Sequence, residues 1–406
     1  MSIFGTMKTS VSGMNAQGNR LGAVGDNIAN SSTIGYKRAS TAFSSMILPS
    51  SAGNYNSGGV SSNIRYSIAE QGGFTFTTSP TDMAIDGNGF FIVSESREPG
   101  AAQFLTRAGS FTRETVEEPA NSGQYKTFLR NAAGFYLFAP AQATASNNQF
   151  PGAVVEIPSN DIKATPTTGG ALQVVLDSKI TDGNSWETSL VGYGYQGVPI
   201  EFEMSFLKTA TGWDIKVTNR DTLAEATGSI TIDPLTGERD GGDSEITFPA
   251  DTATPPTHGD IIIDITKIKQ LNTTSAILSG GLNGKGASSV TDVAINADGS
   301  IDLKYTDGSV IDSGNRIMIA TVTSPDNLIP LSGNVYAASN TSGVLIANDP
   351  GTAGAGDLMV QALENSTVDI ANELTEMIES QRIYTANSKV FQTGSELLEV
   401  LVNLKR

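Results

Sequence analysis

The sequence contains no cysteine and only one histidine, His258, among its 406 residues. The lack of cysteine excludes disulfide bonds, thiolate metal sites and cysteine nucleophiles. A single histidine excludes histidine-rich metal sites and the two-histidine zinc motif. We therefore predict no metal and no cofactor, and we interpret His258 as an incidental loop residue.

Positive charge is scarce as well. Lysine and arginine number 25 against 42 acidic residues, giving a net charge of −17. This balance argues against nucleic-acid binding and against docking on anionic lipid. No apolar run approaches the roughly 20 residues that a membrane helix needs, so we expect no membrane insertion. The first ten residues lack an apolar core and a small-residue cleavage site, so we expect no cleavable secretory signal.

The middle of the chain is rich in turn and strand signals. Its 43 glycines and frequent serine and threonine separate many short alternating segments, a pattern typical of β structure. The stretch Asp-Gly-Asn-Gly at 86–89 predicts a hairpin-type turn before a strand. We therefore expect a mainly β protein between two helical ends.

The last forty residues predict a long helix with a coiled-coil repeat. Ser366 is the expected cap, with Asp369 three residues on. One column of apolar residues recurs every seven positions from Ile370, and a second joins it from Ile383; both have the 3.5-residue period of a coiled coil. The predicted C-terminal assembly seam comprises Ile370, Leu374, Met377, Ile383, Tyr384, Val390, Phe391, Leu397, Leu398, Leu401 and Leu404.

The first thirty residues carry a matching seam at spacings of four and three. It comprises Met7, Val11, Met14, Leu21 and Ile28, with Gly18 and Gly25 between them. Each interior glycine costs a helix about 1 kcal/mol relative to alanine, so a helix this weak should not persist alone in water. We infer that the two terminal helices pair with each other and with copies from other subunits, and are frayed in the free monomer. The alternative is an intramolecular helical hairpin that closes a globular domain.

Five separated stretches resemble the signature sequences of the bacterial flagellar rod and hook proteins. The most specific is Asn-Ile-Ala-Asn-Ser-Ser-Thr-Ile-Gly-Tyr-Lys-Arg at 27–38, and the other four occupy residues 10–17, 82–93, 104–113 and 373–398 in the family's order. In the first stretch, the residues that match the family motif are Asn27, Asn30, Thr33, Gly35, Tyr36 and Lys37.

The chain is expected to nest its domains. We predict a terminal helical domain from 1–30 and 366–406, and an extended connector from 31–70 and 333–365. An inner β domain follows at 71–145 and 286–332. Residues 146–285 carry none of the family motifs and are predicted to form an inserted outer β domain.

The resemblance implies a structural subunit of the flagellar hook with no enzymatic activity. Such subunits polymerise into a flexible curved tube, a universal joint that transmits motor torque from rod to filament. The implied partners are further copies of the chain, the distal rod protein, the hook cap protein, the hook–filament junction proteins and the flagellar type III export apparatus. The implied location is extracellular, on the flagellar basal body and hook.

Two alternatives come from different readings of the same sequence. A distal rod subunit shares the end motifs, but rod subunits are typically shorter and lack a large insertion. A surface enzyme or carbohydrate-binding adhesin would use the insert, where Glu201 and Glu203 lie two residues apart on one strand face. A carboxylate pair can serve glycoside hydrolysis, but no partner for it can be placed from the sequence.

Overall fold

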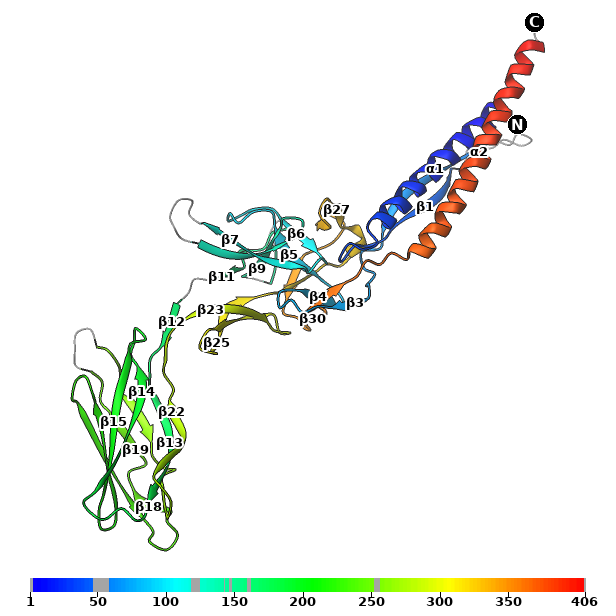
Figure 1. The fold of residues 1–406 in the computed structure, drawn as a ribbon. Helices are drawn as coiled ribbons and strands as arrows, with labels where there is room; N and C mark the ends of the chain where they lie inside the picture. Colours follow the sequence, from blue (N-terminus) through cyan, green and yellow to red (C-terminus); the bar gives the residue numbers. More distant parts are fainter. Residues whose placement is uncertain are drawn as a thin grey trace. The chain divides into compact units, whose positions relative to one another are not determined.

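A computed structural model describes residues 3–46, 58–117, 125–141, 143–145, 148–158, 162–251 and 256–404. The chain forms two compact units. The first comprises Met1–Ile157, Val293–Leu303 and Ile311–Arg406, and the second comprises Pro158–Asp292 and Lys304–Val310. The expectation of a mainly β chain with a helix at each end is confirmed (Figure 1).

The two helices of the first unit are α1 (Ile3–Ala29) and α2 (Ile370–Leu404), and they pack against each other. The predicted cap of α2 is wrong by three residues. Asp369 is the cap, because its carboxylate accepts hydrogen bonds from the backbone N–H groups of Ala371 (2.9 Å) and Asn372 (3.4 Å). Ser366 instead accepts from Val368 N–H, before the helix begins. An aspartate at the N-cap also places negative charge at the positive end of the helix dipole.

Residues after α1 form a hairpin rather than a purely extended connector. Strands β1 (Ala39–Met46) and β2 (Gly59–Tyr66) pair antiparallel, from Ala39 opposite Tyr66 to Met46 opposite Gly59. The hairpin packs on α1, where Asn19 donates to Ser62 and the Ser12 hydroxyl accepts from Val60 N–H. The expected serine-rich part between these strands, 47–57, lies outside the described residues.

An eleven-stranded sheet forms most of the rest of the first unit. Its main path runs β11-β8-β9-β5-β6-β28-β27, with β7 on β8, β10 on β9, and β26 between β5 and β29. The strands are β5 (Phe90–Ser94), β6 (Gln103–Thr106), β7 (Phe111–Glu117), β8 (Tyr125–Asn131), β9 (Tyr136–Pro140), β10 (Gly152–Val154), β11 (Glu156–Ile157), β26 (Ile319–Thr321), β27 (Ile329–Leu331), β28 (Val335–Ala337) and β29 (Ile346–Asn348). A short helix, η1 (Pro325–Asn327), precedes β27.

Two short strand pairs complete the first unit. They are β3 (Phe74–Phe76) with β31 (Ala362–Glu364), and β4 (Met83–Asp86) with β30 (Asp357–Val360). The turn at 86–89 therefore joins strands of two different sheets, since β4 pairs with β30 and β5 with β6, β9 and β26. The prediction of a hairpin there is wrong: turn chemistry specifies a change of direction, but long-range pairing selects the partner strand.

The second unit contains two five-stranded sheets. One is the antiparallel meander β14 (Ser185–Tyr193), β15 (Pro199–Lys208), β16 (Gly212–Asn219), β17 (Glu225–Ile232) and β18 (Arg239–Gly242). The other has the path β19-β20-β13-β21, with β22 also on β13, and comprises β13 (Gly169–Asp177), β19 (Glu245–Phe248), β20 (Ile261–Asp264), β21 (Lys269–Leu271) and β22 (Ala276–Leu282).

One apolar cluster takes residues from both of these sheets. Phe202, Phe206 and Trp213 of the meander pack with residues such as Leu172 and Ile263 of the other sheet. Along β15, buried and more exposed residues alternate, as expected for a strand with one face on a core. His258 lies in the loop before β20, as expected, but it is buried against Phe202 and Phe248.

A four-stranded sheet has the order β12 (Ile162–Thr165), β23 (Lys285–Ile295), β24 (Ser300–Tyr305) and β25 (Val310–Arg316). The unit boundaries fall within β23, β24 and β25. Residues 146–157, assigned by sequence to the inserted domain, belong to the first unit, and 286–292, assigned to the inner domain, belong to the second. The finer division into four nested domains stays a prediction.

Candidate functional site

The terminal helices run in opposite directions and approach closely at glycine. A β carbon on Gly13 of α1 would lie 2.8 Å from Nδ2 of Asn387, and one on Gly394 would lie 2.8 Å from Cγ of Met7. Further along, Arg20 Nη2 lies 3.1 Å from an oxygen of Glu379. The α1 numbers rise as the α2 numbers fall, which defines an antiparallel pair.

The interface between the helices is polar and small, whereas the sequence led us to expect apolar residues. Its buried positions include Ser10, Gln17 and Asn27 on α1 and Glu373 and Ser380 on α2. Gln17 Oε1 and Ser380 Oγ have no hydrogen-bond partner among the residues that the structure describes. Buried polar atoms without partners cost free energy, so this interface is not an optimised core.

The predicted seam residues lie partly at this interface, where Met7 reaches Gly394 of α2, and partly on the exposed faces of the helices. In the N-terminal set Val11 is exposed, and Met7, Met14, Leu21 and Ile28 are half-buried. In the C-terminal set Met377, Ile383 and Leu398 are half-buried. The exposed members are Ile370, Leu374, Tyr384, Val390, Phe391, Leu397 and Leu401. The side chain of Leu404 lies outside the described residues. The role of these residues in assembly stays a prediction, but the single chain leaves most of the C-terminal set exposed.

The motif loop after α1 ties both helices to the β structure. Asn27 is fully buried; its Nδ2 donates to Ala39 O (2.7 Å) and Glu373 Oε2 (3.1 Å), and its Oδ1 accepts from Ala39 N–H (2.9 Å). The Tyr36 hydroxyl donates to the same Oδ1 at 3.3 Å. Burial, with the nearby Asp26 carboxylate, raises the pKa of Tyr36 to about 12.

Three further motif residues shape the loop itself. Asn30 Nδ2 donates to Asp26 O, and Asn30 Oδ1 accepts from the Thr33 hydroxyl, which closes the turn after α1. Gly35 has a φ of +66°, and a β carbon there would lie 2.7 Å from the backbone carbon of Arg107. Only glycine accommodates both the left-handed backbone and this contact.

Lys37 enters a buried ionic cluster in the first unit. Its ammonium lies 2.5 Å from Glu364 Oε1 and also donates to Glu70 O, and Arg107 Nη1 lies 3.2 Å from Glu364 Oε2. Burial lowers the pKa of both Lys37 and Arg107, and the Glu364 carboxylate opposes that effect. One carboxylate thus joins the loop after α1, the strand before α2 and the sheet.

A second, more exposed ionic network fixes α2. Arg38 reaches Glu373 (Nε–Oε1, 2.5 Å) and Glu376 (Nη2–Oε1, 2.7 Å), and Arg20 reaches Glu376 and Glu379.

Sequence reasoning missed the partners of the motif loop. Arg107 and Glu373 lie inside motif stretches that the sequence displays, whereas Glu364 has no comparable signal, because its importance comes from long-range packing.

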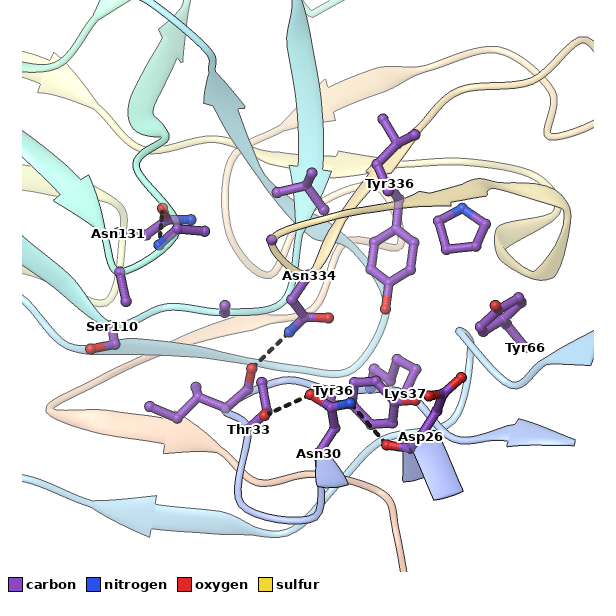
Figure 2. Close-up of a pocket in the computed structure, with 18 of the residues that line it drawn as sticks. Asp26, Asn30, Thr33, Tyr36, Lys37, Tyr66, Ser110, Asn131, Asn334 and Tyr336 are labelled. Carbon is purple, nitrogen blue, oxygen red and sulfur yellow. Dashed lines mark hydrogen bonds between the residues drawn. The ribbon is translucent and has the colours of Figure 1, made fainter. Parts of the chain in front are cut away.

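A pocket of about 760 Å³ opens beside the same loop (Figure 2). Its walls come from the end of α1, the loop at 30–37, residues 108–110 and 131–133, and the β27–β28 turn. Among the described residues, no group of three or more His, Cys, Asp or Glu side chains is arranged to hold a metal ion. No helix within those residues is long and apolar enough to cross a membrane.

The segments that form the paired helices and their ionic junction match models of bacterial flagellar proteins. Residues 7–37 match the family model described as flagella basal body rod protein, and residues 359–404 match the one described as flagellar basal body rod FlgEFG protein C-terminal. These two segments contain α2, most of α1 and all six motif residues of the loop.

Full-length relatives identify the family within that class. The chain is 46% identical to the flagellar hook protein FlgE of Rhizobium meliloti strain 1021 and 42% identical to that of Brucella suis biovar 1, with 100% of each chain covered in both cases. It is 28% identical to the protein of the same name from Salmonella typhimurium, over 98% of this chain and 99% of the relative. The chain belongs to the flagellar hook protein FlgE family.

This result confirms the expected hook assignment over the distal rod alternative. The solved structure of Helicobacter pylori flagellar hook protein FlgE2 matches with a TM-score of 0.46 and 13% identity, over 72% of this chain and 100% of that chain.

Proposed function

We propose that the chain is a structural subunit of the flagellar hook whose copies polymerise through the exposed apolar faces of α1 and α2. The tube that they form is flexible and curved, and it transmits motor torque from rod to filament. One observation carries the proposal: the helix pair buries several polar residues beside small apolar ones, while many large apolar residues of α2 remain exposed. Leu374 is 47% exposed and Val390 51%, while Glu373 and Ser380 are buried.

The energetics of this arrangement favour association. Fully burying one large aliphatic or aromatic side chain contributes about 1.5–3 kcal/mol. Seven of the predicted α2 seam residues are exposed, so neighbouring copies can gain a large apolar surface at a repeat that suits a coiled coil. Contacts of this kind that repeat head to tail without closing produce an open helical array.

The junction supports the transmission of torque. Glu364, Lys37 and Arg107 form a buried charge cluster, and Arg38 links the loop to two glutamates of α2. Contacts from several elements therefore fix the directions in which the helices leave the β structure. Bending of a tube requires contacts between subunits that exchange among near-equal packings, and the partly unsatisfied helix interface is suited to such small shifts.

The other partners are inferred from family membership. They are the distal rod protein, the hook cap protein, the hook–filament junction proteins and the type III export apparatus. Export through that apparatus in an unfolded form would place the subunit outside the cell. The low helix propensity of α1, with five glycines between Gly5 and Gly25, fits a segment that is threaded unfolded.

We also propose that the chain has no catalytic role. The carboxylate pair on β15 supports this view, because Glu201 and Glu203 both face Arg220, at 2.6 and 3.9 Å, on an exposed surface. An exposed ion pair of this kind is a poor general acid and base. Incubating the full-length protein with a glycan panel should give neither binding nor hydrolysis; turnover that is lost in Glu201→Gln would favour the enzyme alternative.

Electron microscopy of cells that lack the protein tests the main proposal. We expect basal bodies that end at the rod, with hooks restored by the wild-type chain but not by a Leu374→Asp chain that accumulates to the same level. Hooks of normal appearance in the deleted cells would contradict the proposal.

A further inference from the structure

The pocket beside the motif loop is lined by polar groups from several elements. Tyr66 and Tyr336 contribute phenol hydroxyls and Asp26 contributes a carboxylate, whereas the hydroxyl of Tyr36 donates to Asn27 (Figure 2). In this wall, Lys37 has its ammonium directed to Glu364 and Glu70. The carboxylate of Asp26 has no partner among the residues that the structure describes.

Tyr336 presents a polar atom to this pocket. The residue is only 3% exposed, yet its hydroxyl points into the pocket (Figure 2) and is not one of the buried side-chain atoms that lack a hydrogen-bond partner among the described residues. The hydroxyl is therefore reached through the pocket, where it can accept a hydrogen bond from a group that enters. Burial is the largest cause of the raised pKa of Tyr336, and the nearby Tyr36 raises it further.

The chemistry of the wall suits a cation. Aromatic rings attract a guanidinium or ammonium group through their negative faces, and a carboxylate adds charge complementarity. A pocket with phenol hydroxyls as acceptors, one unpaired carboxylate and apolar atoms such as those of Leu331 matches an arginine side chain, which has five donors and a planar apolar face.

The helices provide an unpaired arginine. Arg382 and Lys389 on α2 line a shallow hollow with Ile378, and neither side chain has a hydrogen bond or ion pair in the part of the chain that the structure describes. Both lie on the exposed side of α2, beside apolar residues that the proposed function covers with other copies. Covering a cation without a partner costs free energy, so an acidic group on the neighbouring copy that pairs with Arg382 would stabilise the assembly.

We propose that the pocket bounded by Asp26, Tyr66 and Tyr336 receives the Arg382 side chain of a second copy of the chain. This inference rests on the proposed function, because it needs the copies to associate. It adds a specific contact: the junction of one copy holds the helix of another. The ionic pairing fixes the register between copies, which the apolar seam alone does not specify.

Charge reversal tests the contact in full-length protein. Asp26→Lys and Arg382→Glu should each raise the concentration needed for tube formation about tenfold or more. The double variant should recover most of that loss, since it restores opposite charges across the contact. Tyr336→Phe removes only the hydroxyl and should give a smaller rise, whereas Tyr125→Phe, at an exposed position on β8, should give none.

Cross-linking in the naturally cysteine-free chain identifies the occupant. Ser32→Cys, on the exposed rim of the pocket, and Thr385→Cys, beside Arg382, are made in two copies with different tags. Mixed tubes treated with a short thiol-to-thiol reagent should yield a dimer carrying both tags. Tubes that form normally with no such dimer, or a double charge variant no better than the worse single variant, would overturn this inference and leave the proposed function intact. Failure of the wild-type chain to form tubes would instead contradict the proposed function.

Discussion

The second unit buries large apolar residues, whereas the helix pair buries polar and small apolar residues. In the second unit, Phe202, Phe206 and Trp213 are fully buried among other apolar side chains. In the helix pair, the buried positions include Ser10, Asn27, Glu373 and Ser380, and large apolar residues such as Leu397 remain exposed. The second unit therefore forms its apolar core within one chain, whereas the exposed apolar faces of the helices need surfaces of other copies to become buried.

Removing both helical ends should give the largest effect. A chain without residues 1–30 and 366–406 should be a folded, soluble monomer that forms no tubes, because the coiled-coil repeats lie in those ends. Electron microscopy and thermal unfolding monitored by circular dichroism provide the readouts. Normal tubes from this truncated chain would contradict the conclusion that the helical ends supply the contacts between copies.

A single charge on the exposed face should nearly reproduce that loss. Leu374→Asp or Phe391→Asp should block assembly while barely changing the melting of the β structure, because burying an unpaired carboxylate costs several kcal/mol per subunit. Leu235→Asp is the matched control, since Leu235 is 94% exposed in the second unit. Intact tubes from both helix variants would refute the seam assignment.

Within the first unit, the buried charge cluster should matter most for folding. Glu364→Gln leaves Lys37 and Arg107 without their shared carboxylate and should cost about 3–5 kcal/mol. The exposed pair of Glu238 with Lys269 is the control, where Glu238→Gln should cost less than about 1 kcal/mol. Urea denaturation measures both, and equal small losses would show that the cluster does not hold the junction.

A cavity in the second unit should have a local effect on stability. Phe206→Ala should destabilise that unit by about 3–5 kcal/mol, with Leu235→Ala as an exposed control. At temperatures where the variant is still folded, it should form tubes at the wild-type concentration. A large assembly defect in folded Phe206→Ala would show that the two regions are not as independent as the comparison implies.

The smallest effect concerns pH. The pKa of Tyr36 is raised above its ordinary value of 10.0 to about 12, so its neutral phenol stabilises the folded state fully below pH 10. That contribution should be lost as the pH rises through 12, by about 1 kcal/mol once solvent screening is allowed for. Tyr36→Phe should flatten this part of the stability profile of the first unit relative to Tyr125→Phe. Identical profiles for the two variants would exclude the Tyr36 contribution.

Sequence reasoning predicted the elements better than the contacts. Period and composition indicate the two helices and the β-rich middle, because burial on one face leaves a repeat along the chain. The partners of Asn27 and Lys37 could not be predicted, since Glu373 and Glu364 lie more than 300 residues away. The heptad pattern also pointed to the apolar residues and gave no sign that polar residues form the contact within one chain.

Hydrogen exchange on the full-length chain, before and after assembly, tests the central claim most directly. We expect the amides of α1 and α2 to exchange fast in the monomer and to become strongly protected in tubes, while those of the second unit are protected in both states. Slow exchange throughout both helices in a monomer that stays monomeric when seeded with tube fragments would contradict the account.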